Sequence, residues 1–89
     1  MIPPANIAAL RAARARGTTV VLASGRMTAC IDPFFDVLGI DGPVMAYNGA
    51  MLRAEREAGR AVLFHRPLLA AVVTRLIDFT LRRGLHLNV

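Results

Sequence analysis

The chain has 89 residues, of which 55% are hydrophobic, and its formal net charge of +5 comes from arginine without any lysine. A composition this apolar excludes an intrinsically disordered chain, and the length allows one small domain or part of a larger one. The longest stretch without a charged residue has 11 residues, whereas a membrane-spanning helix needs about 18, so no membrane association is expected. Because Cys30 is the only cysteine, no internal disulfide can form, and the cytoplasm is the expected location.

The excess of arginine raises the hypothesis of nucleic-acid binding. Four of the arginines lie within three residues before a glycine: Arg14 and Arg16 precede Gly17, and Arg82 and Arg83 precede Gly84. Cations in the last turn of a helix complement its dipole, and a glycine just beyond commonly ends the helix. These arginines therefore have a structural explanation, no basic stripe remains, and few aromatic residues are available to stack on bases. Nucleic-acid binding is not expected, and steeply salt-dependent retention on DNA or RNA would be its signature.

The first half of the chain predicts helices that alternate with strands. Residues 3–17 have the apolar spacing of a helix, and residues 18–24 (TTVVLAS) predict a strand that is apolar on both faces. Residues 27–40 predict a second helix, in which Asp32–Pro33 either starts a turn or opens the main part, and residues 44–47 predict a second strand. Strands apolar on both faces are typical of parallel sheets covered by helices. The fold class is therefore α/β, a partial Rossmann-like parallel sheet with crossover helices.

The second half of the chain has a different pattern of predicted elements. Residues 50–66 predict a hairpin with arms at 50–55 and 60–66, and the mixed charges around its turn predict a solvated surface. Residues 67–84 then predict a helix, and the alternation in residues 85–89 predicts another strand. This half is expected to be an antiparallel sheet with a helix on it.

Small polar residues follow both strands of the first half. Ser24, Gly25 and Arg26 come directly after the first strand, and Asn48–Gly49 follows the second. In open α/β sheets ligands bind beyond the carboxyl ends of strands, so neighbouring strands would bring these residues to one crevice. A serine hydroxyl and adjacent N–H groups can donate to a phosphoryl oxygen, and glycine lets the backbone approach closely. Strand termination at Gly25, a plain turn at Asn48–Gly49 and a structural ion pair at Arg26 are the alternatives.

The order of these segments resembles the haloacid dehalogenase-like (HAD) hydrolases, and among them the Cof-type phosphatases. The segments that carry the resemblance are ARARG, VVLASGR, LGIDGPV and AYNGAML. The resemblance implies a partial α/β core over residues 1–48 and the beginning of an α+β cap domain over residues 49–89. It also implies a Mg²⁺-dependent phosphatase of a small phosphorylated metabolite, such as a sugar or cofactor phosphate. Ser24 would match the hydroxyl that binds the transferring phosphoryl group, and Asn48 the residue near substrate at the cap junction.

The sequence departs from the family in its catalytic motifs. The family's nucleophile lies in an Asp-x-Asp-Gly-Thr motif, but Asp32, Asp36, Asp41 and Asp78 lack that spacing, and the phosphate-binding lysine is absent. The metal-binding aspartates expected after the cap are not matched either. We therefore expect no catalytic or metal-binding residue here, and a fragment that is inactive alone, with the nucleophile strand belonging before residue 2. The alternative is a non-catalytic anion-binding or interaction module that acts with a partner chain.

The strand expected at Thr19–Ala23 would have an unpaired edge. In the resembled family the nucleophile strand pairs beside it, so without that strand one edge has unpaired N–H and C=O groups. An apolar, uncharged edge of this kind predicts self-association.

Overall fold

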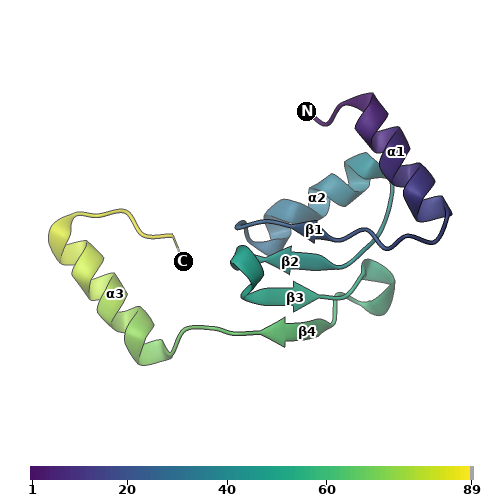
Figure 1. Ribbon diagram of the computed structural model, residues 1–89. Helices are drawn as coiled ribbons and strands as arrows, with labels where there is room; N and C mark the ends of the chain where they lie inside the picture. Colours follow the sequence, from purple (N-terminus) through teal and green to yellow (C-terminus); the bar gives the residue numbers. More distant parts are fainter. Residues whose placement is uncertain (89) are drawn as a thin grey trace.

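The computed structural model describes residues 1–88, which form three helices and a single four-stranded sheet (Figure 1). The elements are α1 (Pro4–Ala15), β1 (Leu22–Ala23), α2 (Thr28–Leu38), β2 (Val44–Ala46), β3 (Met51–Arg53), β4 (Val62–His65) and α3 (Ala70–Arg83). Two short 3₁₀ turns, η1 (Tyr47–Gly49) and η2 (Arg56–Ala58), lie after β2 and inside the hairpin.

The sheet has the order β1-β2-β3-β4, with β1 parallel to β2 and the other neighbours antiparallel. The parallel pair is joined by a crossover through α2, which confirms the α/β fold class. The expected hairpin is present as β3 and β4, but it does not form a separate antiparallel sheet. It continues the sheet of the first half, because β3 pairs with β2 from Val44↔Arg53 to Ala46↔Met51. The division into a core over residues 1–48 and a cap over residues 49–89 stays a prediction.

The core forms where α2 lies on β2. Ile31, Phe35 and Leu38 are buried on α2, at the spacing of one helix face. Val44 and Ala46 are buried on β2, two residues apart and therefore on one face of the strand. This packing fixes the position of α2 relative to β2.

Pro33 lies inside α2, which runs without a break from Thr28 to Leu38. The expectation that Asp32–Pro33 starts a turn or opens the main part of the helix is therefore wrong. Proline lacks an N–H group and loses one intrahelical hydrogen bond. The buried side chains of Ile31 and Phe35 on either side of it hold the helix together through their contacts with the sheet.

Of the predicted strands, one is shorter in the structure and another is not formed. β1 is limited to Leu22–Ala23, shorter than the strand expected over residues 19–23, because only β2 pairs with it. Residues 85–88 have no regular secondary structure, so the strand expected over residues 85–89 is not formed there, and Val89 lies outside the described residues. No neighbouring strand pairs with residues 85–88 within the part of the chain that the structure describes.

α3 stands apart from the sheet, connected to β4 by an irregular segment (Figure 1). It ends as predicted, with Arg82 and Arg83 in its last turn and Gly84 in the left-handed conformation at φ 61°. None of its residues is buried, and Val72, Leu76 and Phe79 are each at least 40% exposed. No helix within residues 1–88 is long and apolar enough to cross a membrane.

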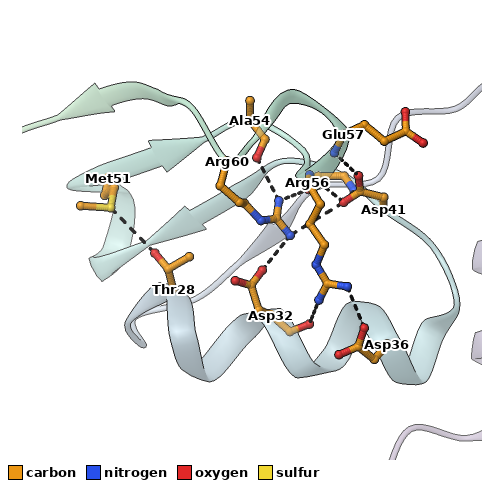
Figure 2. Close-up of polar contacts among 10 residues, drawn as sticks. Thr28, Asp32, Asp36, Asp41, Met51, Ala54, Arg56, Glu57 and Arg60 are labelled. Atoms are coloured by element: carbon orange, nitrogen blue, oxygen red, sulfur yellow. Dashed lines mark hydrogen bonds and ion pairs between the residues drawn. The ribbon is translucent and has the colours of Figure 1, made fainter.

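Arg60 fastens the turn of the hairpin to the rest of the sheet and to α2 (Figure 2). Its guanidinium group donates hydrogen bonds to the carbonyl oxygens of Gly42 at 2.6 Å and Ala54 at 2.9 Å. It also donates to the carboxylate of Asp32 at 2.7 Å and lies 4.9 Å from the centre of the Phe35 ring. The side chain is only 12% exposed, so the expectation of a solvated charged surface is wrong at this residue.

Asp41 and Arg56 complete this cluster, which we call the Arg60 clamp (Figure 2). The Asp41 carboxylate accepts hydrogen bonds from the backbone N–H groups of Arg56 and Glu57, both at 3.1 Å. Burial opposes the ionisation of Asp41, but these N–H groups and the nearby Arg60 outweigh it, and the pKa of Asp41 is lowered from 3.8. Arg56 in turn binds the Asp36 carboxylate at 2.7 Å. The hairpin turn is therefore attached to α2 by charged groups rather than by apolar packing.

The clamp predicts a large effect of Arg60→Met on stability. The substitution keeps the aliphatic stem but leaves Asp32 and two carbonyl oxygens without their donor, so the free energy of unfolding should fall by about 3 kcal/mol. Urea denaturation followed by circular dichroism measures this change. The matched control is Arg75→Met on exposed α3, where we expect a change within about 0.5 kcal/mol. Equal effects of the two substitutions would contradict the role assigned to Arg60.

β1 is the outermost strand of the described sheet, as expected for the edge at Thr19–Ala23. Leu22 N–H and Ser24 N–H donate toward β2, so the N–H groups of Val21 and Ala23 point away from it. Self-association through this edge stays a prediction.

Light scattering after size-exclusion chromatography should show dimers or larger species at micromolar concentration. Val21→Lys, which places a charge on the 45% exposed side chain beside this edge, should shift the chain toward monomer. A wild-type chain that stays monomeric would contradict the prediction.

Candidate functional site

The residues that follow β1 and β2 lie side by side and are tied together by backbone hydrogen bonds. Ser24 N–H donates to the Met45 carbonyl oxygen at 3.0 Å, and Asn48 N–H donates to the Ser24 carbonyl oxygen at 3.2 Å. Tyr47 N–H donates to the Arg26 carbonyl oxygen at 3.1 Å. Parallel pairing brings the carboxyl ends of two strands to the same edge, and these bonds extend the contact beyond the strands.

Ser24 and Gly25 present hydrogen-bond donors at this edge. The Ser24 hydroxyl oxygen accepts a hydrogen bond from Arg26 N–H at 3.1 Å, which leaves the hydroxyl proton available for another acceptor. Within residues 1–88 no hydrogen bond uses the N–H group of Gly25. Ser24, Gly25, Asn48 and Gly49 line a shallow cavity of about 220 Å³. The Ser24 hydroxyl and the Gly25 N–H are therefore two donors that no described acceptor within residues 1–88 uses.

The side-chain amide of Asn48 lies directly over Gly25. A Cβ atom at Gly25 would be 2.9 Å from Asn48 Oδ1, closer than real Cβ contacts. Any larger residue here would have to displace the Asn48 side chain, so Gly25 has a packing role in addition to strand termination.

Three consecutive residues of η1 have left-handed backbone conformations: Tyr47 at φ 53°, Asn48 at φ 54° and Gly49 at φ 94°. Asparagine and glycine adopt this region readily, but tyrosine does so rarely. Ala50 N–H closes the turn by donating to the Tyr47 carbonyl oxygen at 3.2 Å. The Asn-Gly signal predicted a turn, and the structure shows that the turn begins one residue earlier and strains Tyr47.

Arg26 is exposed and reaches a second, larger cavity of about 590 Å³, lined by Gly25, Arg26, Met27, Cys30, Tyr47 and Asn88. No ion pair involves its guanidinium group within residues 1–88, so the alternative of a structural ion pair finds no support there. No motif in the sequence pointed to Met27, Cys30 and Tyr47 as site residues. Met27 and Tyr47 directly adjoin predicted site residues, and Cys30 lies four residues after Arg26.

The carboxylates of this chain do not fit a Mg²⁺ site. Asp32 and Asp36 are bound to Arg60 and Arg56, and Asp41 is held by backbone N–H groups of the hairpin. Within residues 1–88 no three His, Cys, Asp or Glu side chains come together in a way that could hold a metal ion.

The chain belongs to the haloacid dehalogenase-like hydrolases, since the model of that family matches residues 1–89. Among solved structures it is similar to a haloacid dehalogenase-like hydrolase from B. subtilis, with 23% identity and a TM-score of 0.79 over 94% of this chain. It is also similar to a hypothetical protein from Geobacillus kaustophilus HTA426, with 27% identity and a TM-score of 0.76 over 94% of this chain. The match covers 28% and 31% of those two proteins. The comparison with curated proteins gave no match.

The contact between Gly25 and Asn48 predicts the effect of Gly25→Ala. The added methyl group must displace the Asn48 amide, which is the far end of a side chain that can rotate, so stability should fall by about 1 kcal/mol. The side-chain ¹⁵N–¹H resonances of Asn48 should shift. In Gly25→Ala combined with Asn48→Ala the clash is gone, and the two effects on unfolding should be less than additive. Strict additivity would contradict the close approach.

Proposed function

We propose that this chain supplies the phosphoryl-binding corner of a Mg²⁺-dependent phosphatase of the Cof type, which acts on a small phosphorylated metabolite. The observation that supports this function is the juxtaposition of the Ser24 hydroxyl, the free Gly25 N–H and the Asn48 amide at one edge of the sheet. Membership in the haloacid dehalogenase-like hydrolases is consistent with such a site.

The chemistry of the site follows from its donors. Hydrogen bonds from a hydroxyl and an N–H group to an anionic oxygen are stronger than those to neutral acceptors. Because the backbone bonds between the two loops already hold Ser24 in place, little reorganisation is needed when a phosphoryl group arrives. Asn48 is positioned to contact the same group from the second loop, and the charge of Arg26 attracts anions toward the edge.

In this proposal the remaining catalytic groups come from outside residues 1–89. The family's nucleophile motif, its lysine and its Mg²⁺ ligands have no counterpart in this sequence. When bound in the complete enzyme, Mg²⁺ would neutralise phosphoryl charge. The isolated chain is then expected to bind phosphate without hydrolysing phosphate esters, and the expected location is the cytoplasm.

A second candidate is a non-catalytic anion-binding or interaction module that works with a partner chain. The observation that favours it is that the donors at Ser24 and Gly25 occur without a nucleophile in this sequence. Restoration of Mg²⁺-dependent turnover by an added acidic partner would support the split enzyme. Phosphate binding that no such partner converts into turnover would support the module.

The proposed site predicts a difference between two substitutions of Ser24. Ser24→Ala removes the hydroxyl and should weaken binding of inorganic phosphate about tenfold, the effect of one hydrogen bond to a charged group. Ser24→Thr keeps the hydroxyl and should retain binding within about twofold. Titration with phosphate, followed by ¹⁵N–¹H spectra of Ser24 and Gly25, measures both.

Two outcomes would contradict this account. Equal affinities of the Ala and Thr variants would remove Ser24 from the site. Mg²⁺-dependent hydrolysis of p-nitrophenyl phosphate by the pure chain, abolished by Ser24→Ala, would overturn the claim that the chain is inactive alone.

A further inference from the structure

The larger cavity opens directly beside the two-donor site. Gly25 lines both cavities, so a phosphoryl group held by Ser24 and Gly25 would have the rest of its molecule next to the 590 Å³ space. Asn88, from the segment after α3, also lines that space. Figure 1 shows this segment returning toward the carboxyl ends of β1 and β2.

Four of the side chains around this cavity can contact the face or edge of an aromatic ring, and the amide of Asn88 lines it as well. Met27 and Cys30 carry polarisable sulfur, which makes favourable contacts with aromatic rings. Tyr47 offers an aromatic ring for stacking, and the Arg26 guanidinium group can stack on the face of a ring. These four side chains can all pack against a flat ring, whereas only Arg26, Asn88 and the Tyr47 hydroxyl could form hydrogen bonds with a polyol.

Tyr47 combines a strained backbone with an exposed aromatic side chain. Its backbone is left-handed at φ 53°, a strained conformation for a bulky residue, and its side chain remains 46% exposed. The Tyr47 N–H bond to Arg26 and the closing bond from Ala50 maintain this conformation. The strain places an aromatic side chain at the rim of a cavity instead of in the core.

We infer that this cavity binds an aromatic leaving group, so that the preferred ligand is a phosphate monoester of a planar aromatic alcohol. The inference rests on the proposed phosphoryl site at Ser24 and Gly25, and it adds the class of substrate. Tyr47 is then the residue that discriminates aromatic from aliphatic esters, and Arg26 covers one face of the ring.

The test compares two phosphate monoesters on the full 89-residue chain. Phenyl phosphate and glycerol 2-phosphate are titrated while ¹⁵N–¹H spectra are recorded, with inorganic phosphate as a reference. Phenyl phosphate should bind about fivefold more tightly than glycerol 2-phosphate, the size of one aromatic contact. The ring resonances of Tyr47 should shift with phenyl phosphate, and they are unambiguous because it is the only tyrosine.

Two variants separate the ring from the hydroxyl of Tyr47. Tyr47→Phe should keep the ratio of the two dissociation constants, and Tyr47→Leu should bring it close to one. Both variants retain a large side chain at the strained position, and circular dichroism confirms their folding.

Each remaining outcome overturns one of the two claims. Equal affinities for the two esters in the wild-type chain, or a preference that survives Tyr47→Leu, would overturn the aromatic pocket while leaving the phosphoryl site intact. Absence of binding for both esters and for inorganic phosphate would overturn the proposed function itself.

Discussion

The parallel pairing of β1 with β2 is the constraint on which the candidate site depends. It brings Ser24 and Asn48 to the same edge, and the hydrogen bonds from Ser24 to Met45 and from Asn48 to Ser24 continue the pairing into the loops. Without these bonds the two loops would be independent, and their donors would have to be ordered by the ligand at an entropic cost. With them, the site is largely formed before any anion binds.

The Arg60 clamp supports this arrangement from the opposite end of the sheet. β1 contributes only two residues to the pairing, so the position of β2 is set mainly by α2 and by the hairpin. Arg60 links the hairpin to Asp32 of α2 and to the Gly42 carbonyl just before β2. The Arg60 Nε atom is buried without a hydrogen-bond partner in residues 1–88, so the Arg60 clamp forms despite a desolvation cost at this atom.

The sequence predicted those features that depend on local patterns. Helix ends followed from Gly17 and Gly84, both of which have a positive φ, and the adjacency of Ser24 and Asn48 followed from the rule for parallel strands. The assignment of the hairpin to the same sheet was not predictable, because it depends on β2–β3 pairing. The role of Arg60 was not predictable either, since several arginines of the hairpin have similar sequence surroundings and only the structure shows that the Arg60 side chain is 12% exposed. The strained backbone of Tyr47 was not predictable either, because tyrosine as a residue type does not indicate a positive φ.

Hydrogen exchange of the backbone amides of Tyr47 and Asn48 tests the central claim most directly, because both lie outside regular strands and both are donors in the contact between the loops. If the two loops form one preorganised unit, these amides exchange in the ligand-free chain as slowly as the Met45 amide in β2. Exchange of Tyr47 and Asn48 at the rate of an unstructured peptide, while β2 stays protected, would contradict the account.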